Sequence, residues 1–426
     1  NETLYGAAIG EEMVERNGGK AWLIIDRKLW KEARSQVLWG RAQWLVYLGL
    51  WPWLLLWGMP SSASAFIVNL VAIPCISLLV LPAALLGALF EVAFHWPLLL
   101  QWSAIALGWL FSVLQWISGY SPLLHFANPG WLAWVTTLLG VLLLLSPLVR
   151  LLWLPALVCF LPLLCPLFER PPRGEVWVTV LDVGQGLAVH VQTAQHDLLY
   201  DAGARLSSGF DLGEAVVAPA LQASGVKRLD MLLLSHADND HAGGALAVAR
   251  RIPVDRVVSG EPERLPDQLN AELCAAQHWQ WDGVDFTLTP LGADGSQAND
   301  RSCVLQLAAG SNGALLPGDI GQSVEYSLLE KLVPASLLLA PHHGSISSSS
   351  YAFIRRVAPQ WVVFSAGANN RYGHPHAKVV ARYRELSVEP VYTAASGAIR
   401  FTLKANAEPG LSWRWRQQER RFWHEQ

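Results

Sequence analysis

The sequence predicts a polytopic α-helical membrane segment followed by a domain of the layered α/β class. The first observation is the distribution of charge, since 52% of the 426 residues are hydrophobic and only 15% are charged. Between positions 44 and 168 the only Asp, Glu, Lys or Arg residues are Glu91 and Arg150, whereas residues 169–426 carry an ordinary mixture of both signs. The second observation is a change, from Glu175 onward, to short β-rich runs separated by turn residues. Together they exclude a soluble single-domain protein.

The apolar region offers five candidate membrane spans, because a helix needs roughly 20 mostly apolar residues to cross about 30 Å of hydrocarbon. The first is short and contains Pro52, which predicts either a span or a re-entrant segment. The second contains Asn69, Pro74 and Pro82, which predict either a Pro-kinked packing helix or an unwound segment that lines a cavity. The candidate spans are residues 44–58, 65–90, 97–118, 131–149 and 151–168.

The basic residues predict the orientation of these spans. Five of them between Arg27 and Arg41 precede the first span, and Arg150 lies between the fourth and the fifth. Under the positive-inside rule both places are cytoplasmic, so five spans leave the following domain outside the cytoplasm. Arg170 and Arg173, just after the last span, argue weakly against this orientation.

The second region predicts many short strands with helices between them, over about 240 residues, and therefore sheets inside and helices outside. Helices are expected at Leu212–Ser224 and His241–Arg251. The expected strands are Val176–Leu181, Ala188–Gln192, Leu198–Tyr200, Met231–Leu234, Arg256–Val258, Cys303–Leu307, Ala314–Leu316, Leu337–Leu339, Trp361–Phe364 and Ile399–Leu403.

Polar side chains that can bind a metal follow three of these strands. A loop reading Ser-His-Ala-Asp-Asn-Asp-His, residues 235–241, comes directly after one, Asp319 follows another, and His342 and His343 follow a third. Metal ions need several nitrogen and oxygen donors that converge within about 2.0–2.2 Å. A solvated acidic turn would explain the loop alone but not the other strand-end residues. The pattern therefore predicts a metal site, while a net charge of −3 neither supports nor excludes a nucleic-acid partner.

The five cysteines predict no pairing framework, since Cys75, Cys159 and Cys165 lie in the apolar region. Cys274 and Cys303 are too few and too far apart in sequence for a zinc knuckle. The chain begins at residue 1 with asparagine, and no signal-peptide pattern precedes the first domain, so we expect a longer protein whose N-terminal part is missing.

Several motifs together resemble two known families. Tyr-Asp-Ala-Gly at 200–203, His-x-Asp-x-Asp-His at 236–241, Gly-Asp at 318–319 and His-His-Gly-Ser at 342–345 resemble the metallo-β-lactamase fold, a four-layer αββα hydrolase. Leu-Asp-Val-Gly-Gln-Gly at 181–186, Tyr-Gly-His-Pro-His at 372–376 and the upstream polytopic segment resemble the ComEC competence family. Those proteins are taken to pass one DNA strand across the inner membrane.

The resemblance implies an inner-membrane, multi-pass DNA translocation protein whose domain is a periplasmic, metal-dependent nuclease that degrades the non-transported strand. Its partners would be DNA, membrane lipid, and either other competence proteins or further copies of the chain. Two alternatives stay open: a membrane-tethered hydrolase of another phosphodiester or ester, and a non-catalytic DNA-binding channel.

The same resemblance assigns roles to individual residues. Two divalent ions would be bridged by Asp319, and Asp240 would share the catalytic role with it. Asp182, Asp201 and Asn299 would lie beside the ligands. The metal ligands would be His236, Asp238, Asp240, His241, Asp319 and one of His342 and His343, and the substrate contacts would be Ser345, Arg371, His374 and His376.

Three departures from the family patterns bear on activity. Asp238 stands where the fold usually has histidine, and Asn299 lies where it has another. Oxygen donors shift metal preference toward manganese, with zinc and magnesium as alternatives. Leu187 replaces the aspartate that usually ends the Gly-Gln-Gly-Asp motif of competence relatives, which puts full hydrolytic activity in doubt.

The predicted organisation has four parts. Residues 1–43 form a juxtamembrane segment, 44–168 the spans, 175–405 the hydrolase-like domain and 406–426 a basic-aromatic tail. The alternation of tryptophan and arginine in the tail is typical of a single-strand or phosphate-binding surface, and equally of a membrane-interface anchor.

Overall fold

The computed structural model describes residues 45–418, apart from short gaps at 56–60, 63, 122, 125–129, 147, 166–167, 292–297 and 406–408. The predicted juxtamembrane segment and the end of the tail lie outside the described residues. The chain divides into two compact units between Leu167 and Phe168, and each is described here by itself.

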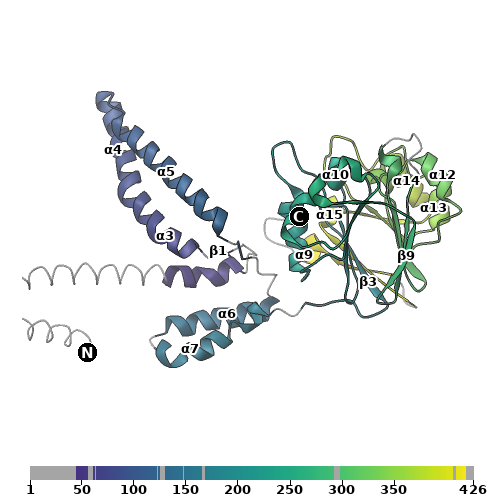
Figure 1. Ribbon diagram of the computed structural model, residues 1–426, viewed down its shortest axis with the longest axis horizontal. Helices are drawn as coiled ribbons and strands as arrows, with labels where there is room; N and C mark the ends of the chain where they lie inside the picture. Colours follow the sequence, from purple (N-terminus) through teal and green to yellow (C-terminus); the bar gives the residue numbers. More distant parts are fainter. Residues whose placement is uncertain are drawn as a thin grey trace, which may run out of the picture. The chain divides into compact units, whose positions relative to one another are not determined.

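The N-terminal unit is helical, and each of the five predicted spans contains helix (Figure 1). Two helices, Ile67–Phe94 and Leu98–Tyr120, are long and apolar enough to cross a membrane. Their side chains are mostly exposed, with only 18% and 11% of their most apolar windows buried, unlike the core helices of a soluble protein. The helices of this unit are Leu45–Leu55, α3 (Ala65–Pro74), η1 (Cys75–Val80), α4 (Leu81–Phe94), α5 (Leu98–Tyr120), α6 (Gly130–Leu145), α7 (Val149–Val158) and α8 (Leu161–Leu164).

The second predicted span is a helix throughout and is not unwound. α3 ends at Pro74, and the next turns, Cys75–Val80, are π-helical. Proline has no backbone N–H to donate to an α-helical hydrogen bond, and the backbone stays helical after Pro74 by forming wider π turns. Pro82 is the second residue of α4, directly after the π turns, and the backbone stays helical there. Of the two alternatives, the structure has the Pro-containing packing helix.

The C-terminal unit contains two mixed sheets. The eight-stranded sheet has the order β17-β16-β3-β4-β5-β6-β7-β8, and the seven-stranded sheet has the order β15-β14-β13-β12-β11-β10-β9. The strands are β3 (Glu175–Val180), β4 (Val189–Gln192), β5 (Asp197–Tyr200), β6 (Met231–Leu234), β7 (Val257–Ser259), β8 (Glu272–Leu273), β9 (Gln277–Trp281), β10 (Val284–Thr289), β11 (Val304–Ala309), β12 (Asn312–Leu316), β13 (Leu337–Leu339), β14 (Trp361–Phe364), β15 (Glu389–Tyr392), β16 (Ile399–Lys404) and β17 (Gly410–Arg414).

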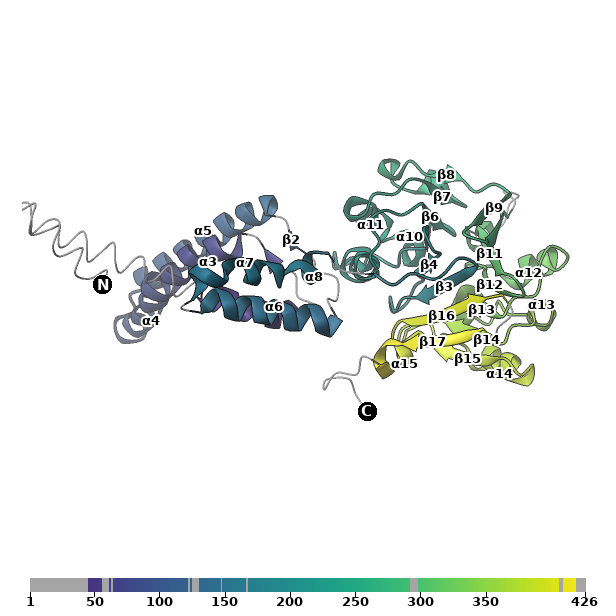
Figure 2. The same ribbon diagram turned by 90° about the horizontal axis from the view of Figure 1, so that it is seen from below.

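The sheets pack face to face with helices on their outer faces, which confirms the predicted αββα layers (Figure 2). Between the sheets lies one apolar core that contains Val178, Tyr200, Phe286 and Phe401. Separate apolar clusters join each sheet to its own helices. Those helices are η2 (Gly213–Val217), α9 (Ala218–Ala223), α10 (Asn239–Ala242) and α11 (Ala245–Arg251) on one side, and α12 (Gln322–Leu328), α13 (Tyr351–Val357) and α14 (Ala377–Glu385) on the other.

Two features differ from the sequence-based expectation. Residues 410–414, which were assigned to the tail, form β17 and pair with β16 at the edge of the eight-stranded sheet. Cys274 and Cys303 form a disulfide with a Cα–Cα separation of 6.2 Å, a single bond that the sequence did not predict. Cys274 follows β8 and Cys303 precedes β11, so the bond joins the two sheets, a proximity that sequence spacing does not reveal.

Candidate metal centre

The predicted metal-binding residues lie where parallel strands end. β6 leads into the ligand loop at Ser235–His241, and β12 and β13 lead to Asp319 and to His342-His343. β5, β6 and β7 are parallel, as are β12, β13 and β14, so the carboxyl ends within each set share one edge of their sheet. This topology brings residues that are a hundred positions apart into contact.

Four of the predicted ligands form a compact cluster: Asp240, His241, Asp319 and His343 have ligand atoms within 4.8 Å of one another. His241 Nε2 lies 3.2 Å from both Asp319 Oδ1 and His343 Nε2. His343 Nε2 is 3.4 Å from Asp240 Oδ2 and 3.6 Å from Asp319 Oδ2. Ligands placed about 2.0–2.2 Å from a tetrahedral ion are separated by roughly 3.3–3.6 Å, so the four residues fit one ion.

Hydrogen bonds orient both histidines of the cluster. His241 Nδ1 donates to Asp201 Oδ2 at 2.7 Å, and His343 Nδ1 donates to the carbonyl oxygen of Ser365 at 2.8 Å. Each bond fixes the tautomer in which Nε2 carries the lone pair and faces the cluster, as is usual for metal-binding histidines. Asp201 is fully buried and also accepts from the backbone N–H of Ser235 at 2.6 Å and from its hydroxyl at 2.9 Å. Asp201 therefore holds the ligand loop as well as one ligand.

The carboxylates of the cluster are held in their ionised form. Burial opposes ionisation, yet the imidazoles of His241 and His343 keep the pKa of Asp319 well below its usual range. Burial also acts against Asp240, but its hydrogen bond with His343 and the positive charge that His241 carries when no ion is bound lower its pKa to about 2. Both carboxylates are thus available as anionic ligands at neutral pH.

His236 and Asp238 lie beside this cluster but are arranged differently. His236 is fully buried, and its Nε2 has no hydrogen-bond partner within the described part of the chain. An orphaned buried nitrogen of this kind is costly unless something binds it. Its nearest carboxylate oxygen is Asp238 Oδ2, at 3.8 Å, which suits two ligands of a second ion. Asp238 Oδ1 faces away and accepts a hydrogen bond from Arg264 at 2.9 Å.

His342 and Asn299 approach the cluster from its open side. His342 Nε2 lies 3.8 Å from Asp319 Oδ2 and 3.5 Å from the Asn299 amide nitrogen. The compact cluster takes His343, which is buried, whereas the His342 side chain is 29% exposed. His342 is therefore placed to face a substrate or a second ion.

Two of the predicted substrate contacts lie in a line of rings that leads away from the cluster. The ring of His374 stacks on His343, with centroids 6.3 Å apart, and its Nδ1 is buried without a hydrogen-bond partner among the described residues. Tyr372 stacks on His374 at 5.8 Å, and the Arg371 guanidinium lies 4.8 Å from the Tyr372 ring centre. His374 is thus within reach of a ligand on the cluster, and Arg371 lies further out.

The remaining predicted residues have local hydrogen-bond partners. His376 Nδ1 accepts from the backbone N–H of Lys378 and caps α14. Ser345 is buried and its hydroxyl lies 3.0 Å from that of Ser347. Asp182 Oδ2 accepts from Arg416 at 2.8 Å, so this carboxylate binds the basic segment after β17.

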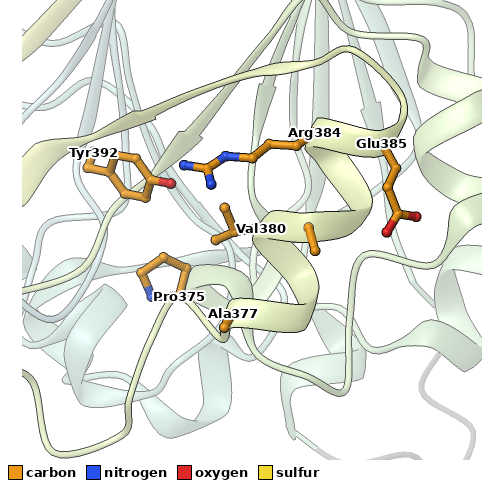
Figure 3. Close-up of a pocket in the computed structure, with 7 residues that line it drawn as sticks. Pro375, Ala377, Val380, Arg384, Glu385 and Tyr392 are labelled. Carbon is orange, nitrogen blue, oxygen red and sulfur yellow. The ribbon is translucent and has the colours of Figure 1, made fainter.

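A groove of about 510 Å³ lies along α14, near the loop that carries His374 (Figure 3). None of the four cluster residues lines it. In Figure 3 the Arg384 guanidinium extends toward Tyr392 across the groove. Its lining residues are Pro375, Ala377, Val380, Ala381, Arg384, Glu385 and Tyr392.

The sequence reasoning missed a buried carboxylate beneath the ligand loop. Glu261 is 2% exposed and accepts from the backbone N–H of Ala237 at 3.1 Å and from Arg264 at 2.7 Å. It also accepts from Arg301 at 3.3 Å. The signal was present, because Glu261 follows the buried strand β7 as Asp319 follows β12.

Leu187 lies in the apolar core between the sheets and is 5% exposed. Only the backbone of Leu187 contacts the site. Its N–H donates to the Asp240 carbonyl oxygen at 3.1 Å, and its carbonyl oxygen accepts from the Gly203 N–H at 2.9 Å. A carboxylate at this position would enter the core rather than the metal cluster.

We therefore expect Leu187→Asp to destabilise the domain instead of activating it. The variant loses a buried aliphatic side chain and gains an unpaired buried carboxylate, which together cost about 3 kcal/mol or more. The midpoint of thermal unfolding, followed by near-UV circular dichroism in detergent, measures the effect, and Leu187→Met is the matched control. An unchanged midpoint with faster substrate cleavage would contradict this placement.

Comparisons with known proteins match both units of the chain. Residues 20–163 match the family model described as "Competence protein", and residues 181–364 match that of the metallo-β-lactamase superfamily. Competence protein ComA of Neisseria gonorrhoeae is 37% identical over 79% of this chain and 48% of that protein. Recombination protein 2 of Haemophilus influenzae is 32% identical over 57% and 30%, and ComE operon protein 3 of Bacillus subtilis is 29% identical over 84% and 51%. The chain thus spans about half the length, or less, of these curated relatives.

Among solved structures, the metallo-β-lactamase fold protein YhfI of Bacillus subtilis is 13% identical. It matches 50% of this chain and 95% of its own length, with a TM-score of 0.34.

Proposed function

Because the chain belongs to the ComEC competence family and carries a metallo-β-lactamase superfamily domain, we propose that it acts in DNA uptake and that this domain hydrolyses the non-transported strand. The proposal extends to a membrane-embedded segment that passes the other strand. The observation that supports a hydrolytic role most directly is the cluster of Asp240, His241, Asp319 and His343, which has the donor set and the spacing of a divalent-metal site.

The residues present fit a pair of divalent ions, with manganese favoured by the carboxylate-rich donor set. His241, His343, Asp240 and Asp319 would hold the first, and His236, with Asp319 shared between the two, would contribute to the second. Bound there, the ions supply an acidified water and positive charge for the phosphate oxygens.

The chain's own side chains account for the remaining needs of phosphodiester hydrolysis. The Asp240 side chain is 34% exposed, whereas that of Asp319 is 6% exposed, so Asp240 is the carboxylate that incoming water reaches first. Asp240 would hold that water by accepting a hydrogen bond from it. His342 and His374 flank the cluster on its open side and would donate hydrogen bonds to phosphate oxygens.

The test is a cleavage assay on the full chain in detergent, stripped with a chelator and then supplied with manganese. End-labelled single-stranded DNA, duplex DNA and a generic aryl phosphodiester are the three substrates. Metal-dependent shortening of DNA supports the nuclease. Cleavage of the aryl ester alone supports a hydrolase of another phosphodiester, and DNA binding without cleavage of any substrate supports the non-catalytic channel.

We also propose that the protein is a multi-pass inner-membrane protein with its metal domain in the periplasm. The basic residues before the first span and at Arg150 support this orientation under the positive-inside rule. Arg170, which argues weakly against it, has a structural role instead. Its guanidinium donates to Asp197 at 2.9 Å and to the carbonyl oxygens of Thr193 and His196 at 3.2 Å, so it is bound within the domain. The Cys274–Cys303 disulfide adds support, since such bonds persist mainly in oxidising compartments.

A reporter fused after the last residue should reveal this orientation. We expect alkaline phosphatase to be active at that position, because it requires disulfide formation outside the cytoplasm, and a cytoplasmic reporter to be inactive. The same pair of reporters fused in the turn at Arg150, which we expect to be cytoplasmic, is the internal control. The opposite pattern after the last residue would mean that the number of spans is even.

A further inference from the structure

We propose that Arg264 makes the affinities of the two ion positions unequal, because it binds the Asp238 carboxylate and holds a positive charge beside the second position. The chain would then hold one ion tightly at Asp240, His241, Asp319 and His343, and a second ion only weakly. This inference rests on the metal site of the proposed function, and it concerns a residue to which the sequence assigned no role.

The first ion position is complete without Asp238. Its ligand atoms come from Asp240, His241, Asp319 and His343 and lie within 4.8 Å of one another, and His241 and His343 are 3.2–3.6 Å from their neighbours in the cluster. Three of these four residues are buried. The position therefore offers four ligands to an ion without Asp238.

The second position is short of ligands. His236 Nε2 and Asp238 Oδ2 are 3.8 Å apart and would have to share Asp319 with the first ion. Asn299 lies where the fold usually has a further histidine, and its amide nitrogen points to His342. An asparagine can ligate a cation only through its amide oxygen, so Asn299 does not supply the imidazole that the fold usually has there.

Arg264 already neutralises the carboxylate on which the second position depends. One guanidinium nitrogen donates to Asp238 Oδ1 at 2.9 Å, and another donates to Glu261 Oε2 at 2.7 Å. A guanidinium shared by two carboxylates is oriented more firmly than a single surface ion pair. An ion at the second position must therefore compete with a cation that is held beside it.

Glu261 keeps Arg264 in this place. The Glu261 side chain is buried, and besides Arg264 it accepts from the backbone N–H of Ala237, inside the ligand loop, and from Arg301. A Cβ on Gly260 would lie 2.1 Å from the Arg301 carbonyl oxygen, so a glycine at 260 allows the backbone beside Glu261 to approach the backbone of Arg301. The buried carboxylate thus ties the loop with Asp238 to the arginine that pairs with it.

A fixed guanidinium at this position has a consequence for the substrate. The Arg264 side chain is 43% exposed, so part of the guanidinium stays accessible to solvent while it pairs with Asp238 and Glu261. A guanidinium binds phosphate oxygens through two parallel N–H groups. Arg264 would thereby supply to the phosphodiester part of the positive charge that a second tight ion supplies in a symmetric site.

The test is a calorimetric titration of manganese into the chelator-stripped full chain in detergent, which reads ion number and affinity independently of DNA cleavage. We expect one tight ion and a second at least about tenfold weaker in the wild type. Arg264→Met should tighten the second by about tenfold, the effect of removing one charge-assisted competitor. Arg264→Lys should keep the inequality, and Arg251→Met, which breaks the exposed pair with Glu214, is the matched control.

Two ions of equal affinity in the wild type, or an unchanged isotherm for a folded Arg264→Met variant, would overturn the inference. Circular dichroism identifies a variant that fails to fold, and Arg264→Gln then takes its place. An isotherm without any bound ion would overturn the proposed function as well. One tight ion in a chain that does not cleave DNA would support the inference and refute only the nuclease.

Discussion

Replacing Asp319 by alanine should abolish tight metal binding and DNA cleavage together. Asp319 is the only residue of the cluster whose two oxygens contact two different histidines, His241 at 3.2 Å and His343 at 3.6 Å. Without Asp319, the cluster keeps the His241 and His343 imidazoles, whose Nε2 atoms are 3.2 Å apart, and only the Asp240 carboxylate. We expect metal affinity to fall by more than about a hundredfold, since even the loss of a residue that supports a ligand costs 10–100-fold.

The measurement is manganese titration and cleavage rate on the same preparation. Asp255→Ala is the matched control, because Asp255 is a half-exposed carboxylate paired with Arg228 at 2.9 Å and remote from the cluster in the fold. Asp319→Asn tests whether charge or shape matters. If Asp319→Ala still binds one ion tightly, the cluster is not the primary site.

The ligand cluster could be predicted from sequence because the rule behind it is local. A polar residue directly after a buried strand can be identified without knowing the fold, and Asp319, His343 and the ligand loop all obey that rule. Glu261 obeys it as well, directly after β7, but no family motif drew attention to it.

The strands that the sequence reasoning missed were of two kinds. β9 and β10 form a hairpin around Asp282-Gly283, both with positive φ, a turn that the Asp-Gly pair signals in the sequence. β8, which has two residues, β15 and β17 lie at sheet edges, and each pairs on one side only. Short edge strands have a weak alternating pattern because much of their surface faces solvent.

Contacts between distant loops could not be predicted. Nothing in the sequence indicates that Arg264 binds Asp238, 26 positions earlier, or that the carbonyl of Ser365 accepts from His343. Such pairs depend on which loops the two sheets bring to one edge. The same holds for Cys274 and Cys303, each of which lies beside a different sheet.

The choice of metal should depend on Asp238, and this is the second large effect we expect. The described site offers Asp240 and Asp319 as oxygen donors, with Asp238 at its margin, so manganese should give the highest cleavage rate in a panel that includes zinc and magnesium. Asp238→His should shift the preference toward zinc, because it puts an imidazole in place of a carboxylate whose Oδ2 lies 3.8 Å from His236 Nε2 and which Arg264 now binds.

The panel is run on the chelator-stripped full chain, with cleavage rate and bound metal measured in parallel. Asp267→His, on the exposed turn after Pro266, controls for an added surface imidazole. Full activity of the wild type with zinc alone would overturn the manganese preference. An Asp238→His variant that keeps the wild-type order of metals would show that Asp238 is not a ligand, and that its bond to Arg264 persists when the ions are bound.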